Sequence, residues 1–93
     1  MKLTAQNLEE ILEVAKEAVK ENYYCFNYQI NGYDIYVSRD EFDEDNWFVE
    51  PNKIDENGCS EPIEDWSYII EYGNFDQLIE TCKDMAERYF EEV

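Results

Sequence analysis

Residues 23–38 read YYCFNYQINGYDIYVS, two runs rich in aromatic and β-branched residues on either side of Asn31-Gly32. Asn-Gly favours a type I′ turn, because both central residues of that turn need positive φ. With a two-residue loop, one face of the hairpin carries only apolar or aromatic pairs: Ile30–Tyr33, Tyr28–Ile35 and Phe26–Val37. The opposite face carries the more polar pairs: Gln29–Asp34, Asn27–Tyr36 and Cys25–Ser38. Turn and pattern therefore predict an antiparallel hairpin with one buried face.

Amphipathic helices are predicted on both sides of this hairpin. In the first, over about residues 4–22, Thr4 is a suitable N-cap, and Leu3 and Leu8 have the spacing of a hydrophobic staple. The second begins after Asn74, which can form a capping box with Gln77. Apolar residues recur at helical spacing in both segments: Leu8, Ile11, Leu12, Ala15, Ala18 and Val19 in the first, and Phe75, Leu78, Ile79, Cys82, Met85, Ala86, Tyr89, Phe90 and Val93 in the second.

One or two further strands are predicted between the hairpin and the second helix. Residues 47–49 form a short β-rich run that Pro51 is expected to end, because proline cannot donate to a β-ladder. In residues 66–72 every second side chain, starting from Trp66, is aromatic or branched. The predicted order is α-β-β-β-(β)-α. It fits the α+β class, with a small antiparallel sheet of three to four strands packed against N-terminal and C-terminal helices in a single domain over residues 1–93.

Negative charge is the outstanding property of the composition. The chain has 24 Asp and Glu residues against seven Lys and Arg residues, a net charge of −17. Residues 40–65 hold 11 acidic residues and a single basic one, Lys53, so this segment carries −10. Net charge governs solubility and the choice of partners rather than the fold. A surface of this kind is expected to repel nucleic acid and anionic membranes and to attract basic proteins and cations.

The residue types of common catalytic sites are missing or scattered. There is no His in the chain, which removes the usual general base and the usual metal ligand. The three glycines form neither a GxGxxG motif nor a phosphate-binding loop. Among 24 acidic residues some carboxylates meet by chance, so a carboxylate pair gives no signal for a hydrolase. We therefore expect no enzymatic activity, no catalytic residues, no structural metal site and no cofactor.

Residues 53–64 match part of an EF-hand calcium loop. The matching residues are Asp55, Asn57, Gly58 and Glu64. Lys53, however, stands where the first carboxylate of such a loop belongs, and Pro62 lies inside the loop. An ordinary Asp-Glu-Asn-Gly turn is the favoured interpretation. Weak, nonspecific binding of divalent cations to the acidic segment stays open.

Cysteine usage and the N-terminal sequence bear on the compartment. Cys25, Cys59 and Cys82 are odd in number and have no CxxC spacing. The first residues lead into the predicted helix without the apolar region of a signal peptide. No apolar run approaches the ~20 residues that span a bilayer. We therefore expect reduced cysteines and a cytoplasmic protein.

The most distinctive part of the acidic segment is RDEFDEDNW, residues 39–47. One interpretation is a solvated loop that keeps the protein soluble and protects a sheet edge. The other is a recognition surface, in which carboxylates take bidentate contacts from Arg and the aromatic residues act as anchors, unless those residues belong to the core. The predicted partner-binding residues are Asp40, Glu41, Phe42, Asp43, Glu44, Asp45, Trp47, Glu50, Asp55, Glu56, Glu61, Glu64 and Asp65.

In size, charge, lack of His and helix–strands–helix order, the chain resembles the small phage-encoded anti-CRISPR inhibitors, some of which mimic DNA at a CRISPR nuclease. Residues 40–65 and the hairpin over residues 23–38 carry this resemblance. It covers the whole chain as architecture and rests on no motif, so no site residue is carried over. More loosely, the chain resembles acidic immunity proteins that plug ribonuclease active sites, although the barstar type has parallel strands and this hairpin is antiparallel.

The leading hypothesis is an inhibitor that presents carboxylates in place of phosphates, since duplex DNA carries one negative charge per ~1.7 Å. Its partner is expected to be a basic protein, either a nucleic-acid-binding protein or a nuclease, and the chain itself is expected to bind neither nucleic acid nor membranes. The alternative is a regulatory, adaptor or immunity-type protein whose acidity serves mainly solubility or salt adaptation. Clustering of the acidic residues argues against salt adaptation. The identity of the partner and the oligomeric state stay open.

Overall fold

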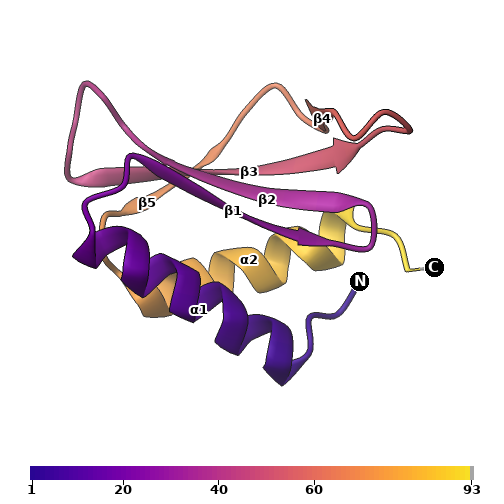
Figure 1. Cartoon of the computed structure of the whole chain (residues 1–93), viewed down its shortest axis with the longest axis horizontal. Coiled ribbons are helices and arrows are strands. Elements are labelled where there is room, and N and C mark those ends of the chain that lie inside the picture. The colour runs from indigo at the N-terminus through magenta and orange to yellow at the C-terminus, as the bar shows by residue number, and fades with distance from the viewer. Residues whose placement is uncertain (93) are drawn as a thin grey trace.

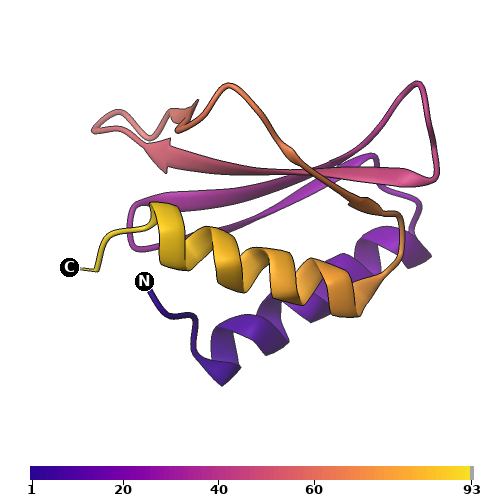
Figure 2. The same ribbon diagram turned by 180° about the vertical axis from the view of Figure 1, so that it is seen from behind.

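Five antiparallel strands and two helices make up residues 1–92, the part of the chain that the computed structural model describes. The elements in chain order are α1 (Ala5–Lys20), β1 (Cys25–Ile30), β2 (Tyr33–Arg39), β3 (Asn46–Ile54), β4 (Ser60–Pro62), β5 (Tyr68–Glu71) and α2 (Phe75–Tyr89). Both helices lie on one face of the sheet and leave the other face without a helix (Figures 1 and 2). The predicted α+β class is confirmed, with β4 as an additional short strand.

The β1–β2 hairpin has the predicted register at all six pairs. Asn31 and Gly32 adopt φ angles of 46° and 82°, the positive values that a type I′ turn needs. Ile35 and Val37 consequently point to the helix side and are buried. Within residues 1–92, β1 pairs with β2 alone, so the other side of β1 is an edge of the sheet.

β3 is longer than predicted. It runs without interruption through Pro51, so the prediction that this proline ends the strand is wrong. Pro51 lies opposite Ile35 of β2, and its carbonyl accepts a hydrogen bond from the N–H of Ile63, at 3.0 Å. Ile63 lies on the side of β3 away from β2, and the N–H and C=O of one strand residue point to the same side. The N–H that Pro51 lacks is therefore not needed in the ladder between β2 and β3.

Two short strands share the side of β3 that faces away from β2. β5 pairs with residues 46–49 of β3, and β4 pairs with residues 52–54. Within β5 the predicted alternation is confirmed, because Ile70 is 4% exposed whereas Ile69 is 63% exposed. The strand is shorter than the predicted range 66–72, and Trp66, which precedes it, is 46% exposed. β4 was not predicted, because Ser60–Pro62 has neither an apolar alternation nor a β-branched residue.

α1 begins as predicted and ends slightly earlier. The Thr4 hydroxyl accepts a hydrogen bond from the N–H of Asn7 at 3.1 Å, and the Asn7 side chain accepts one from the N–H of Thr4 at 2.9 Å, a reciprocal capping box. At the other end Asn22 adopts a left-handed φ of 57°, and the N–H of Tyr23 donates to the carbonyl of Ala18. This Schellman motif ends the helix at Lys20 rather than at about residue 22.

α2 carries the predicted apolar stripe toward the sheet. Asn74 caps the helix by accepting a hydrogen bond from the N–H of Gln77 at 3.1 Å. The predicted capping box is not completed, because the Gln77 side chain accepts a hydrogen bond from the N–H of Glu71 at 3.0 Å instead. The helix ends at Tyr89, after which Phe90 is extended and stacks on Tyr33 with ring centroids 4.5 Å apart. The predicted stripe continued to Val93, which lies outside the described residues.

Trp47 is the centre of the core. Its side chain is 2% exposed, and its ring makes edge contacts with Phe26 at 5.7 Å and with Tyr72 at 5.0 Å. A tilted contact with Phe75 adds a third ring at 6.3 Å. These partners come from β1, from the residue after β5 and from α2, so one side chain connects the hairpin, the fifth strand and the second helix.

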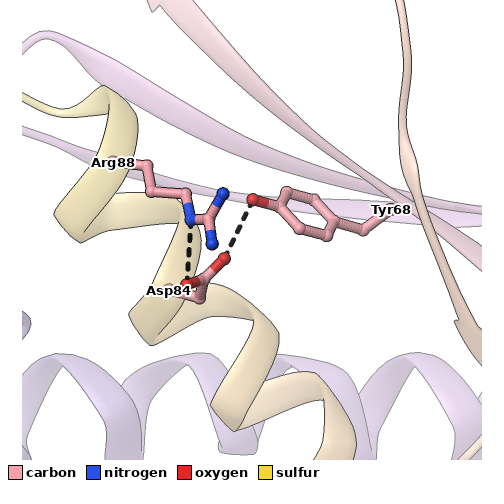
Figure 3. A network of polar contacts seen from close by, with 3 residues as sticks. All are labelled: Tyr68, Asp84 and Arg88. Carbon is pink, nitrogen blue, oxygen red and sulfur yellow. Dashed lines mark hydrogen bonds and ion pairs between the residues drawn. The ribbon is translucent and has the colours of Figure 1, made fainter.

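A polar network fastens β5 to α2 (Figure 3). The Tyr68 hydroxyl donates to one oxygen of Asp84 at 3.1 Å, and Arg88 Nε donates to the other oxygen at 3.1 Å. The Arg88–Asp84 pair is the i, i+4 ion pair that the helix pattern contains. Burial, followed by the hydrogen bond to Asp84, raises the pKa of Tyr68 from 10 to about 12.

Substitutions at neighbouring positions of β5 test the assignment of its two faces. Ile70→Ala removes a buried side chain and should lower the free energy of unfolding by about 2–5 kcal/mol. Ile69→Ala removes an exposed one and should change it by less than about 0.5 kcal/mol. Urea denaturation of both variants measures these changes, and equal losses would contradict the assignment.

Alkaline pH should weaken the fold through Tyr68. Its folded pKa lies above its unfolded value, so the protonated phenol contributes stability that is complete below pH 10 and is lost as the pH rises to about 12. Denaturation curves between pH 9 and about 12 measure this loss. Tyr68→Phe, which cannot ionise, should show a shallower decline over the same interval than the parent chain. Parallel declines would show that Tyr68 titrates alike in both states.

Candidate functional site

The acidic residues of the segment 40–65 do not form one cluster. The nine residues of β3, at about 3.3 Å per residue, separate its two ends by roughly 26 Å. Residues 40–45 lie in the loop between β2 and β3, at the left of Figure 1, whereas Asp55 and Glu56 lie in the turn at the other end of β3. Glu50 lies between them on the helix-free face, and Glu64 and Asp65 follow β4. The residues that are contiguous in sequence are thus spread along the sheet.

The loop over residues 40–45, here called the acidic tip, is held by its own side chains. Asp40 accepts a hydrogen bond from the N–H of Phe42 at 2.9 Å. Asp43 accepts one from the N–H of Asp45 and one from the side-chain amide of Asn46, both at 3.1 Å. The backbones of Asp40 and Asn46 are joined at 3.0 Å across the base of the loop. The backbone of the acidic tip therefore has a defined conformation before any partner binds.

Arg39 contacts the backbone of the acidic tip. Its Nε donates to the carbonyl of Glu44 at 2.9 Å, and its guanidinium lies 4.0 Å from the ring centroid of Tyr72. The N–H of Tyr72 in turn donates to the carbonyl of Asp45 at 2.8 Å. The basic residue next to the acidic tip is thus engaged with the backbone and with an aromatic ring. Its charge is not paired with a carboxylate among residues 1–92.

Phe42 projects from the acidic tip and is 92% exposed. Full burial of such a side chain stabilises by about 1.5–3 kcal/mol, which this fold does not gain. Tyr23 and Tyr24 are half exposed and, with Arg39, Asp40, Glu41 and Glu44, line a hollow of about 220 Å³ beside the acidic tip. Aromatic faces next to carboxylates are suited to a guanidinium or an ammonium group.

The predicted aromatic anchors have different positions. Phe42 lies at the surface, whereas Trp47 is buried in the core and has to be removed from the predicted recognition surface. Tyr23 and Tyr24 were missed, although the signal was available. The register that pairs Cys25 with Ser38 also brings Tyr24 next to Arg39, whose N–H donates to the Tyr24 carbonyl at 2.8 Å.

The segment with partial EF-hand spacing forms a tight turn between β3 and β4. One oxygen of Asp55 accepts hydrogen bonds from the N–H groups of Asn57 and Cys59, both at 2.9 Å. This carboxylate organises the turn, as the favoured interpretation expected. Across residues 1–92, no three His, Cys, Asp or Glu side chains are arranged to hold a metal ion.

Comparison with known protein families, with curated proteins and with solved structures finds no match to this chain. Neither helix, within residues 1–92, has the length and apolar character needed to cross a membrane. The geometry of the acidic tip and of the sheet must therefore support any functional assignment.

Asp43 and Glu44 should differ sharply in their effect on stability, although either substitution by alanine removes one negative charge. Asp43→Ala removes two hydrogen bonds within the acidic tip and should cost about 1–2 kcal/mol. Glu44→Ala removes an exposed side chain and should change stability by less than about 0.5 kcal/mol. Thermal denaturation at one pH and salt concentration compares them. A smaller loss for Asp43→Ala than for Glu44→Ala would contradict the described loop.

Proposed function

We propose that this chain is a non-enzymatic acidic protein that inhibits a basic nucleic-acid-binding protein or nuclease by presenting carboxylates where that partner binds phosphates. The observation that carries the proposal is the acidic tip, where Phe42 is 92% exposed in a hydrogen-bonded loop. The side chains of Glu41, Glu44 and Asp45 point to solvent around it and accept no hydrogen bond within residues 1–92. An exposed aromatic side chain on an ordered loop can serve as an anchor in a partner's pocket, and the carboxylates around it can pair with Arg or Lys.

The charge density of the whole molecule supports mimicry of nucleic acid. The longest dimension of the molecule is 35 Å and its net charge is −17, which is about one charge per 2 Å. Duplex DNA carries one negative charge per ~1.7 Å of its axis. A groove that attracts DNA through Lys and Arg side chains should therefore attract this protein with comparable strength at long range.

The fixed backbone of the acidic tip supports specific binding over diffuse attraction. A loop that is already ordered loses little conformational entropy when a partner binds, so more of its contact energy appears as affinity. Charged pairs that form at close range in an interface slow dissociation, whereas distant charges mainly change the association rate. Phe42 among these carboxylates adds an apolar contact that solubility alone does not require.

Two triple substitutions with the same change of charge test the proposal. Glu41→Gln, Glu44→Gln and Asp45→Asn neutralise the acidic tip. Glu9→Gln, Glu13→Gln and Glu17→Gln neutralise the exposed side of α1, and each set moves the net charge from −17 to −14. Proteins that the parent chain captures from the native cytosol are purified and bound to labelled duplex DNA or RNA. The parent chain and each variant are then compared in their ability to displace the nucleic acid from these proteins. The tip variant should displace nucleic acid at least tenfold less effectively, about 1.4 kcal/mol, with faster dissociation.

The α1 variant should mainly associate more slowly, and this difference should disappear as salt is raised. Phe42→Ala should weaken binding severalfold without lowering the melting temperature, because the side chain is exposed in the free protein. Captured partners that keep their nucleic acid in the presence of the parent chain would contradict mimicry. Equal losses in the two triple variants would place the function in the overall charge rather than in the acidic tip.

A further inference from the structure

A polar hollow of about 480 Å³ lies on the helix-free face of the sheet. Here it is called the open-face hollow, and the residues that define it come from four strands: Asn27, Asp34, Tyr36, Glu50, Asn52 and Ser60. The strand register brings them together, because Asp34 lies opposite Asn52 and Tyr36 lies opposite Glu50. No Lys or Arg lines this hollow, which is distant from the acidic tip along β2 and β3.

Asp34 forms the floor of the open-face hollow and is 3% exposed. One of its oxygens accepts a hydrogen bond from the Asn27 side-chain amide at 2.9 Å, and the other accepts one from the Ser60 hydroxyl at 3.4 Å. Both donors are neutral, and no ion pair of Asp34 is formed within residues 1–92. A buried carboxylate without a counter-ion attracts a cation strongly, because little water screens its charge.

Asn52 gives a second and independent indication of a ligand. It is 6% exposed, and its side-chain oxygen is buried without a hydrogen-bond partner among residues 1–92. Buried oxygens of this kind nearly always accept a hydrogen bond in folded proteins. The amide can turn about its terminal side-chain torsion and bring this oxygen into the hollow, since no side-chain hydrogen bond within the described residues opposes the rotation.

Glu50 places a second carboxylate at the rim. It occupies the position diagonal to Asp34 on the neighbouring strand, where Cα atoms are roughly 7–8 Å apart. Its carboxylate accepts a hydrogen bond from the Ser67 hydroxyl at 3.2 Å. Tyr36 is a neutral phenol near pH 7, and a hydrogen bond with the Cys25 thiol and then burial raise its pKa from 10 to about 12. The hollow thus offers two separated negative charges and several neutral hydrogen-bonding groups.

We propose that the open-face hollow binds a guanidinium group, with Asp34 and Glu50 on two of its edges and the Asn52 oxygen on a third. A guanidinium carries five N–H donors in a planar fork and can contact separated acceptors at once. An ammonium group directs its three donors from a single nitrogen and reaches fewer of these positions. This proposal does not depend on the acidic tip. The ligand can be an arginine side chain of a protein or a free guanidino compound.

Titration with N-acetyl-argininamide, followed by ¹H–¹⁵N NMR, tests the site. The side-chain amide of Asn52 and the backbone of Asp34 should shift most, and the shifts should persist at about 0.15 M salt, where exposed charges are largely screened. N-acetyl-citrullinamide, a neutral ligand of nearly the same shape, should bind at least tenfold more weakly. N-acetyl-lysinamide should bind severalfold more weakly. Shifts that spread evenly over the acidic surface, or equal affinity for the citrulline compound, would overturn the proposal.

Three variants separate binding from folding. Asp34→Asn keeps the shape of the side chain and should weaken binding of the arginine compound at least tenfold. Glu13→Gln, on the exposed side of α1, removes the same charge and should weaken it by less than twofold. Asn52→Leu removes the buried oxygen without a partner, so it should weaken binding while leaving the melting temperature unchanged or higher. A lower melting temperature for Asn52→Leu together with unchanged affinity would show that Asn52 is structural only, and would overturn the proposal.

Two compounds distinguish the possible sources of the guanidinium. Agmatine is a free guanidino compound, whereas a Gly-Arg-Gly peptide blocked at both ends presents the guanidinium as a protein side chain does. Tighter binding of the peptide would identify the site as a receptor for a protein side chain. Tighter binding of agmatine, at a salt concentration that removes the effect of its second charge, would identify a small-molecule site. Binding of neither compound would overturn the proposal, whatever the result obtained with the acidic tip.

Discussion

The left-handed turn at Asn31-Gly32 is the constraint on which most other features of the structure depend. Side chains alternate between the two faces of a strand, so a shift of one residue in register would move every side chain of the hairpin to the opposite face. The observed register places Val37 beneath the helices and Asp34 on the helix-free face. β3 pairs along the whole of β2, and the register of that second pair places Asn52 opposite Asp34. The hairpin register thus assigns its side chains to the core or to the open-face hollow, and the pairing of β3 with β2 completes both.

Elements with local signals could be predicted from the sequence, and features that depend on distant pairing could not. The hairpin register, the cap at Thr4 and the alternation at Ile69 and Ile70 each follow from neighbouring residues. The position of Pro51 within β3 could not be predicted, because the direction of its missing N–H depends on the pairing with β2. β4 could not be predicted because a short, exposed strand needs no apolar residues.

The residue types of the candidate site could be predicted from the sequence, but not which of those residues lie together at the surface. Phe42 and Trp47 stand five residues apart in the same acidic stretch, yet one is exposed and the other forms the centre of the core. The difference arises because β3 begins at Asn46 and pairs with both β2 and β5, which encloses Trp47 between strands and helices. Acidic residues that are consecutive in sequence are separated by the length of β3, so a run of charge in the sequence overstates its density in space.

The free side of β1 has a consequence for how copies of this protein behave toward one another. A sheet edge with unpaired backbone groups is a template for pairing with a second chain, and many proteins cover or interrupt such an edge. Here two approaching copies each bring a charge of −17, and repulsion between them opposes contact before the edges can align. Acidity then serves colloidal stability. A variant evolved toward a weaker charge would need another way to protect its first strand from self-association.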